Sequence, residues 1–73
     1  MAITLKAARV NANLTQIQFA NALGVSKLTV SEWETGKRRI KPAYLPAIAR
    51  VTGVSVDDII LPVVITKGNK GGK

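Results

Sequence analysis

The sequence contains no cysteine and no histidine, and it has only one tryptophan, one tyrosine and one phenylalanine. Without cysteine the chain can form no disulfide and no cysteine-rich metal site. Without histidine it lacks the most common general base and the most common metal ligand. Acidic residues are also scarce, with four Asp and Glu against eleven Lys and Arg. The composition therefore predicts a protein that is not an enzyme and that uses no metal or other cofactor.

Long hydrophobic runs are absent as well. No apolar stretch approaches the roughly 20 residues of a membrane-spanning helix, and the N-terminus lacks the basic start and long apolar block of a signal peptide. These absences predict a cytoplasmic protein with no membrane partner. What the chain does have is 73 residues, enough for one small domain, and a net charge of +7, which favours polyanionic partners.

Residues 15–36 have the spacing of two short helices joined by a tight turn. Thr15 and Gln18 match a capping box and predict the start of the first helix. Gly24 can adopt the positive φ that ends a helix, and Ser26 is a suitable N-cap for the next one. Two short helices so closely connected cross at a wide angle, which leaves the second exposed on one side. This is the helix-turn-helix arrangement.

The rest of the chain predicts three further helices and a tail. The domain is therefore expected to be all-α over residues 1–62, with helices over about 4–12, 16–23, 27–35, 44–52 and 56–61. The last helix is predicted from Ser55 as N-cap and from Asp58 at the N3 position of a capping box. The expected core is apolar and comes from all five helices and the basic loop: Leu5, Ala8, Phe19, Ala20, Leu23, Val30, Trp33, Ile40, Leu45, Ile48, Ala49, Ile59 and Ile60.

Residues 63–73 are predicted to form an apolar segment followed by a short, flexible, basic tail. Residues 63–66 are β-prone, and residues 67–73 are rich in glycine and lysine. The apolar segment has two interpretations. It folds back over the core, or it contributes to a homodimer, which is the interpretation we favour.

The ordered run Leu14-Thr15-Gln16, Ala20, Leu23-Gly24-Val25-Ser26 and Trp33-Glu34-x-Gly36-Lys37 resembles the lambda-repressor-like family of helix-turn-helix DNA-binding proteins, also called XRE or Cro/CI-type. The resemblance extends over about residues 5–61. It implies a DNA-binding function. It also implies that Gln16 touches a DNA phosphate with the help of a helix N-terminus, and that Arg9 pairs with Glu34 to hold the first and third helices together.

The second helix of a helix-turn-helix enters the major groove, where its outward residues meet base edges. Val30 and Trp33 are expected to face inward, which leaves an outward set of Lys27, Leu28, Ser31 and Glu32, with Ser26 and Thr29 near the entry. Chemically, Lys27 can donate to guanine, Leu28 can contact a thymine methyl, and Glu32 can accept from cytosine N4. The basic loop that follows is predicted to clamp the DNA backbone through Lys37, Arg38 and Arg39, with Lys41 close by. The alternative for both is an ordinary solvated surface.

The sequence thus predicts a transcriptional regulator, similar to phage Cro or a prophage repressor, that binds a double-stranded DNA operator as a homodimer. Two residues favour a different function. Ile17 and Leu28 are apolar and are expected to be exposed near each other across the turn, and an exposed apolar pair can mark a protein contact. The alternative is an antirepressor or modulator that binds a partner repressor through this outward face.

Overall fold

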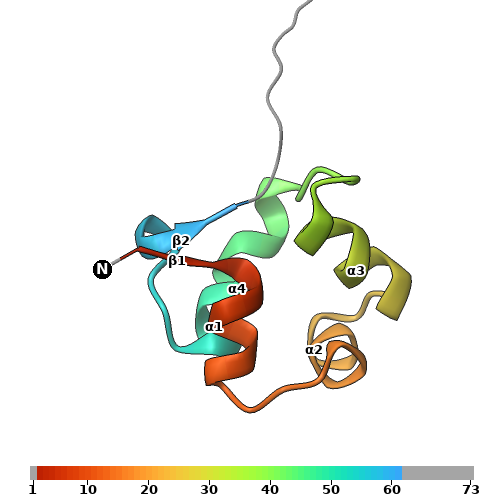
Figure 1. Cartoon of the computed structure of the whole chain (residues 1–73), viewed down its shortest axis with the longest axis horizontal. Coiled ribbons are helices and arrows are strands. Elements are labelled where there is room, and N and C mark those ends of the chain that lie inside the picture. The colour runs from red at the N-terminus through yellow and green to blue at the C-terminus, as the bar shows by residue number, and fades with distance from the viewer. Residues whose placement is uncertain (1, 62–73) are drawn as a thin grey trace, which may run out of the picture.

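Residues 2–61 are described by a computed structural model of the chain and form a mostly helical domain. They contain four α-helices, two 3₁₀ turns (η) and a two-stranded parallel sheet, in the order β1 (Ile3–Thr4), α1 (Leu5–Asn11), α2 (Gln16–Leu23), α3 (Lys27–Thr35), η1 (Pro42–Tyr44), α4 (Leu45–Thr52), η2 (Val56–Asp58) and β2 (Ile59–Ile60). Helices α2 and α3 lie together at one end of the molecule, and the sheet lies at the other (Figure 1). The predicted tail over residues 63–73 lies outside the described residues.

Each of the first three helices starts at a side-chain cap, and the caps of α2 and α3 are the predicted Thr15 and Ser26. The Thr4 hydroxyl accepts from the Ala7 amide at 3.0 Å and caps α1. Thr15 and Gln18 form the expected capping box on α2, with reciprocal hydrogen bonds of 2.9 and 3.1 Å. Each cap satisfies an amide that has no partner within its own helix. Each of these short helices therefore begins directly after its cap residue.

The connection between α2 and α3 depends on one glycine. Gly24 has a φ of 75°, a backbone conformation that L side chains adopt only with strain. The chain reverses there, and the Val25 amide donates to the Ala20 carbonyl at 3.0 Å. The Ser26 hydroxyl then accepts from the Thr29 amide at 3.1 Å and opens α3. The helix-turn-helix predicted from the sequence is therefore present.

A single apolar core connects all parts of the described chain. Its buried members come from the helices, the loop after α3 and the last strand: Leu5, Phe19, Ala20, Val30, Trp33, Ile40, Ile48 and Ile59. All eight are among the core residues predicted from the sequence. Burial of Ile40 attaches the basic loop to the domain, so this loop leaves α3 in a fixed direction.

The predicted fifth helix is wrong. Ser55 accepts from the Asp57 amide at 3.3 Å, but the turn it opens is a single 3₁₀ turn, η2. Ile59 and Ile60 are extended and pair in parallel with Ile3 and Thr4. Successive side chains of a strand point to opposite faces, so Ile59 is buried whereas Ile60 is exposed. The domain is therefore not purely α-helical, and Ile60 does not join the core.

Prolines shape the segment before α4. Pro42 starts η1, a turn that was not expected from the sequence, and Pro46 lies in the first turn of α4, as predicted. At that position the missing amide of proline costs no intrahelical hydrogen bond.

Across residues 2–61, every helix is too short or too polar to cross a membrane.

Candidate nucleic-acid interface

Helix α3 is held by one face and exposed on the other. Val30 and Trp33 are fully buried, and the Trp33 ring lies 5.3 Å from the Tyr44 ring at a tilt of 56°. Trp33 is therefore a core aromatic residue. At the start of the helix, Lys27 is exposed and Leu28 is 63% exposed. The N-terminal end of α3 can thus reach a partner without any rearrangement of the core.

The predicted recognition residues differ in their exposure to solvent and in their hydrogen bonds. Ser26, Lys27 and Leu28 are exposed, whereas Thr29, Ser31 and Glu32 are half-buried. The Ser26 and Thr29 hydroxyls lie 2.9 Å apart and hydrogen-bond to each other, in addition to the Ser26 cap. Lys27 and Leu28 are therefore the most accessible of these residues. The Ser26 and Thr29 hydroxyls are instead engaged in hydrogen bonds at the start of α3.

A buried ion pair joins α1 to α3. The Arg9 Nε donates to Glu34 Oε2 at 2.6 Å, and Nη2 lies 3.3 Å from Oε1. The two side chains are only 9% and 3% exposed. The remaining nitrogen, Nη1, donates to the Leu14 carbonyl at 2.7 Å, so Arg9 is bound on every side. The pair implied by the family resemblance is present, and it joins α1 to α3.

Gln16 extends this cluster to the surface of α2. Its Nε2 donates to Glu34 Oε1 at 3.0 Å, so the first residue of α2 is tied directly to α3. The Gln16 side chain is half-buried. The family resemblance assigns Gln16 to a phosphate, and nothing in the sequence predicts its hydrogen bond to Glu34. In the structure it links the buried pair with the end of α2 at which an anion would be favoured.

A second ion pair connects α3 to the basic loop. The Arg38 Nε and Nη2 both lie 2.8 Å from Glu32 Oε1, and the side chains of Arg38 and Glu32 are 53% and 27% exposed. The amides of Lys37 and Arg38 also donate to the Glu32 carbonyl, at 2.8 and 3.2 Å. Glu32, predicted to read cytosine, therefore already has a partner, and Arg38 is held against α3 instead of extending freely from the loop.

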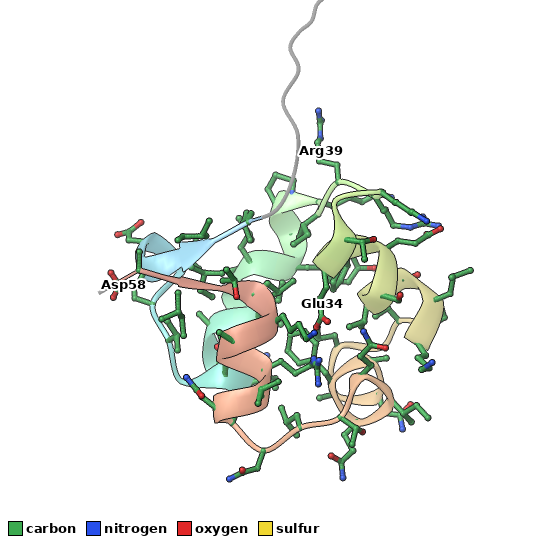
Figure 2. All side chains as sticks on the ribbon, viewed as in Figure 1. Glu34, Arg39 and Asp58 are labelled. Carbon is green, nitrogen blue, oxygen red and sulfur yellow. The ribbon has the colours of Figure 1, made fainter. Side chains whose placement is uncertain are left out.

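The other cations of the loop face solvent. Lys37, Arg39 and Lys41 are exposed, and Figure 2 shows the Arg39 side chain pointing away from the body of the domain. A hollow of about 320 Å³ lies between the helix-turn-helix and this loop and is lined by Gly24, Val25, Ser26, Thr29, Trp33, Arg38, Arg39, Lys41 and Tyr44. Arg39 and Lys41 contribute exposed cationic side chains to its wall, so this part of the surface attracts anions.

Exposed apolar side chains also occur on the helix-turn-helix. Ile17 on α2 is 55% exposed, and Leu28 on α3 is 63% exposed, which confirms the exposure expected from the sequence. No group of Asp and Glu side chains that could hold a metal ion forms within residues 2–61. The chemistry available at this end of the domain is therefore cationic donation, hydroxyl hydrogen bonding and apolar contact.

The chain is similar in sequence to known proteins of one family. The family model described as "Helix-turn-helix" matches residues 5–59, which include all four α-helices. The chain is also similar to the HTH-type transcriptional activator BcrR of Enterococcus faecalis, with 36% identity over 56 residues, or 77% of this chain. It spans only 28% of the length of that relative. The match over residues 5–59 shows that the chain belongs to the XRE-type helix-turn-helix family.

Proposed function

We propose that the chain is a sequence-specific DNA-binding regulator of transcription, similar to phage Cro or a prophage repressor, that inserts α3 into the major groove. The observation that carries this proposal is the placement of α3. Its inner face is fixed by Val30 and Trp33 and by the Arg9–Glu34 pair, whereas Lys27 and Leu28 are exposed at its N-terminal end. A rigid helix with an exposed N-terminal end suits contact with base edges.

Charge supports the same function. The net charge of +7 and the exposed cations of the loop provide the attraction to phosphates on which DNA affinity depends. In this proposal Lys37 and Arg39 contact the backbone, and Gln16 reaches a phosphate at the start of α2. These contacts position α3 without carrying sequence information. The regulator would act in the cytoplasm and bind a double-stranded operator.

The size of the domain favours a dimer on DNA. One small module buries too little DNA for strong discrimination, and two copies on half-sites about 34 Å apart would double the contact. Sedimentation of the protein with a two-site duplex tests this part of the proposal. A complex with one protein chain on an intact palindromic site would contradict it.

Selection from random duplexes followed by binding titrations tests the main proposal. A single family of sequences should be enriched, and its affinity should fall with salt with a log–log slope of about −0.9 for each phosphate neutralised. A salt-independent affinity, or the absence of any enriched sequence, would contradict a role as sequence-specific DNA-binding regulator.

A second function is supported by the exposure of Ile17 and Leu28. In this alternative the outward face of the helix-turn-helix binds a partner repressor, and the chain acts as an antirepressor or modulator. Exposed apolar side chains on two helices that pack together can mark a protein contact. A gel shift with a neighbouring repressor distinguishes the two: the alternative predicts no DNA binding by the chain alone and loss of the repressor's own complex.

A further inference from the structure

The Glu32–Arg38 pair leaves half of the Arg38 guanidinium unused. A guanidinium has two edges with paired donors: one formed by Nε and Nη2, and one formed by Nη1 and Nη2. Glu32 occupies the first edge, because both Nε and Nη2 lie 2.8 Å from its Oε1. The Nη1 atom donates no hydrogen bond to any of the described residues. The second edge therefore keeps its donors available on a side chain that is 53% exposed.

The backbone holds Arg38 in place as well. Gly36 ends α3 with a φ of 80°, and the Lys37 and Arg38 amides then fold back onto the Glu32 carbonyl. Two residues later Ile40 is buried in the core. Arg38 is thus fixed to α3 through its own amide, through its side chain and through the anchored loop. Any movement of α3 into a groove carries this guanidinium with it.

Pairing also changes what Arg38 can do for binding. The carboxylate of Glu32 largely cancels the charge of Arg38 at distances beyond about 8 Å, the screening length at physiological salt. A neutralised pair adds little to the long-range attraction of phosphates. Its directional hydrogen bonds remain, and a side chain that is already restricted loses less freedom when it binds. This combination suits recognition of a base edge better than a contact with the backbone.

From these observations, and on the basis of the proposed DNA-binding function, we infer that Arg38 reads a guanine in the major groove and that Glu32 is its positioning residue. The free edge of Arg38 matches guanine O6 and N7, the acceptor pair that arginine contacts with two hydrogen bonds. Glu32 acts through Arg38 and does not itself accept from cytosine. The loop after α3 thereby contributes to sequence recognition, and the operator contains a guanine opposite the C-terminal half of α3.

Substitution of single guanines in the selected duplex by 7-deazaguanine, which lacks the N7 acceptor, tests this inference. Wild-type protein should lose about fivefold or more in affinity at one guanine, since a complete two-bond contact is worth about 5- to 150-fold. Arg38→Ala should bind the normal and the substituted duplex equally well. Glu32→Ala should also lose most of the 7-deazaguanine effect, and the double variant should show no further loss of discrimination.

Arg39→Ala is the matched control, because Arg39 is adjacent and exposed. It should weaken binding to all duplexes about equally and keep the 7-deazaguanine effect. If Arg38→Ala behaves like Arg39→Ala, Arg38 contacts a phosphate and the inference is wrong. If Glu32→Ala keeps the full 7-deazaguanine effect but loses selection at another base pair, Glu32 reads a base itself and its positioning role is wrong. If wild-type protein enriches no duplex, the proposed function itself fails.

Discussion

Two glutamates on α3, Glu32 and Glu34, each pair with an arginine, but in opposite settings. Glu34 is buried with Arg9, and every donor edge of that guanidinium has a partner. Glu32 pairs with Arg38 at the surface, and one edge of that guanidinium is free. Residues two apart on a helix point to different sides of it. The same chemistry therefore joins α3 to the body on one side, and on the other side it leaves one donor edge of an arginine without a partner among the described residues.

Burial, and not the presence of an ion pair alone, decides whether the pair contributes mainly to stability or is available for binding. Removal of one partner from a buried pair leaves an uncompensated charge without water. An exposed charge that loses its partner is solvated instead, so the loss is small. The Arg9–Glu34 pair should therefore be visible in stability measurements, and the Glu32–Arg38 pair in binding measurements.

The largest expected effect comes from Arg9→Ala. It should cost about 3–5 kcal/mol because Glu34 would remain buried without its partner, and the core of so small a domain supplies only about 3–5 kcal/mol in total. Urea denaturation followed by circular dichroism should show a largely unfolded chain at 25 °C. Arg38→Ala is the control and should cost at most about 1 kcal/mol. An Arg9→Ala variant that melts within a degree or two of wild type would remove the distinction between the pairs.

Next in size is Lys27→Ala on the outward face of α3. Lys27 is exposed, so the stability of the domain should hardly change. Binding to the selected duplex should weaken by about 1–3 kcal/mol, and the preference at one base pair should be relaxed. Competition between duplexes with all four bases at each position measures this. Equal weakening on every duplex would instead assign Lys27 to a phosphate.

Gln16→Ala should give a smaller effect on two measurements. Gln16 donates to Glu34. A hydrogen bond to a charged group contributes about 1.5–3 kcal/mol, and for this half-buried side chain we expect the lower end of that range, about 1.5 kcal/mol. Stability should fall by about that amount, and DNA affinity should fall equally on all sequences because the proposed phosphate contact would be lost. Paired melts and titrations test this. A change in stability with unchanged affinity would limit Gln16 to the buried cluster.

The smallest expected effect is that of Lys37→Ala, in the loop. Lys37 is exposed and has no side-chain hydrogen bond among the described residues. The variant should keep its sequence preference and its stability, whereas the log–log salt slope should become less steep by about 0.9. Titrations at several salt concentrations measure the slope. A loss of sequence preference would place Lys37 at a base edge.

Local signals were enough to predict most of the fold. The four α-helices begin and end close to the predicted residues because their caps, Thr4, Thr15, Ser26 and Gly24 among them, act within a few residues of sequence. The last segment was predicted wrongly because its pairing is not local. Ile59 and Ile60 pair with Ile3 and Thr4 from the other end of the chain, and this contact, with the β-branched side chains, favours extended backbone over a helix.

Less of the candidate site than of the fold could be predicted from the sequence. The outward position of Lys27 and Leu28 followed from the helical period, and the Arg9–Glu34 pair followed from the family resemblance. The Glu32–Arg38 pair was missed because the residues lie on either side of Gly36, where the chain leaves the helix and simple helical spacing no longer applies. The Gln16–Glu34 hydrogen bond was missed because it depends on how α2 packs against α3.

The central claim is that α3 reads DNA sequence while the buried Arg9–Glu34 pair holds it in position. Fluorescence anisotropy of wild-type protein with the selected duplex and a scrambled duplex of the same composition, over a series of salt concentrations, tests it most directly. We predict that the selected duplex binds on the order of 10³-fold more tightly and that both affinities fall steeply with salt. Equal affinity for the two duplexes, or an affinity independent of salt, would contradict the claim.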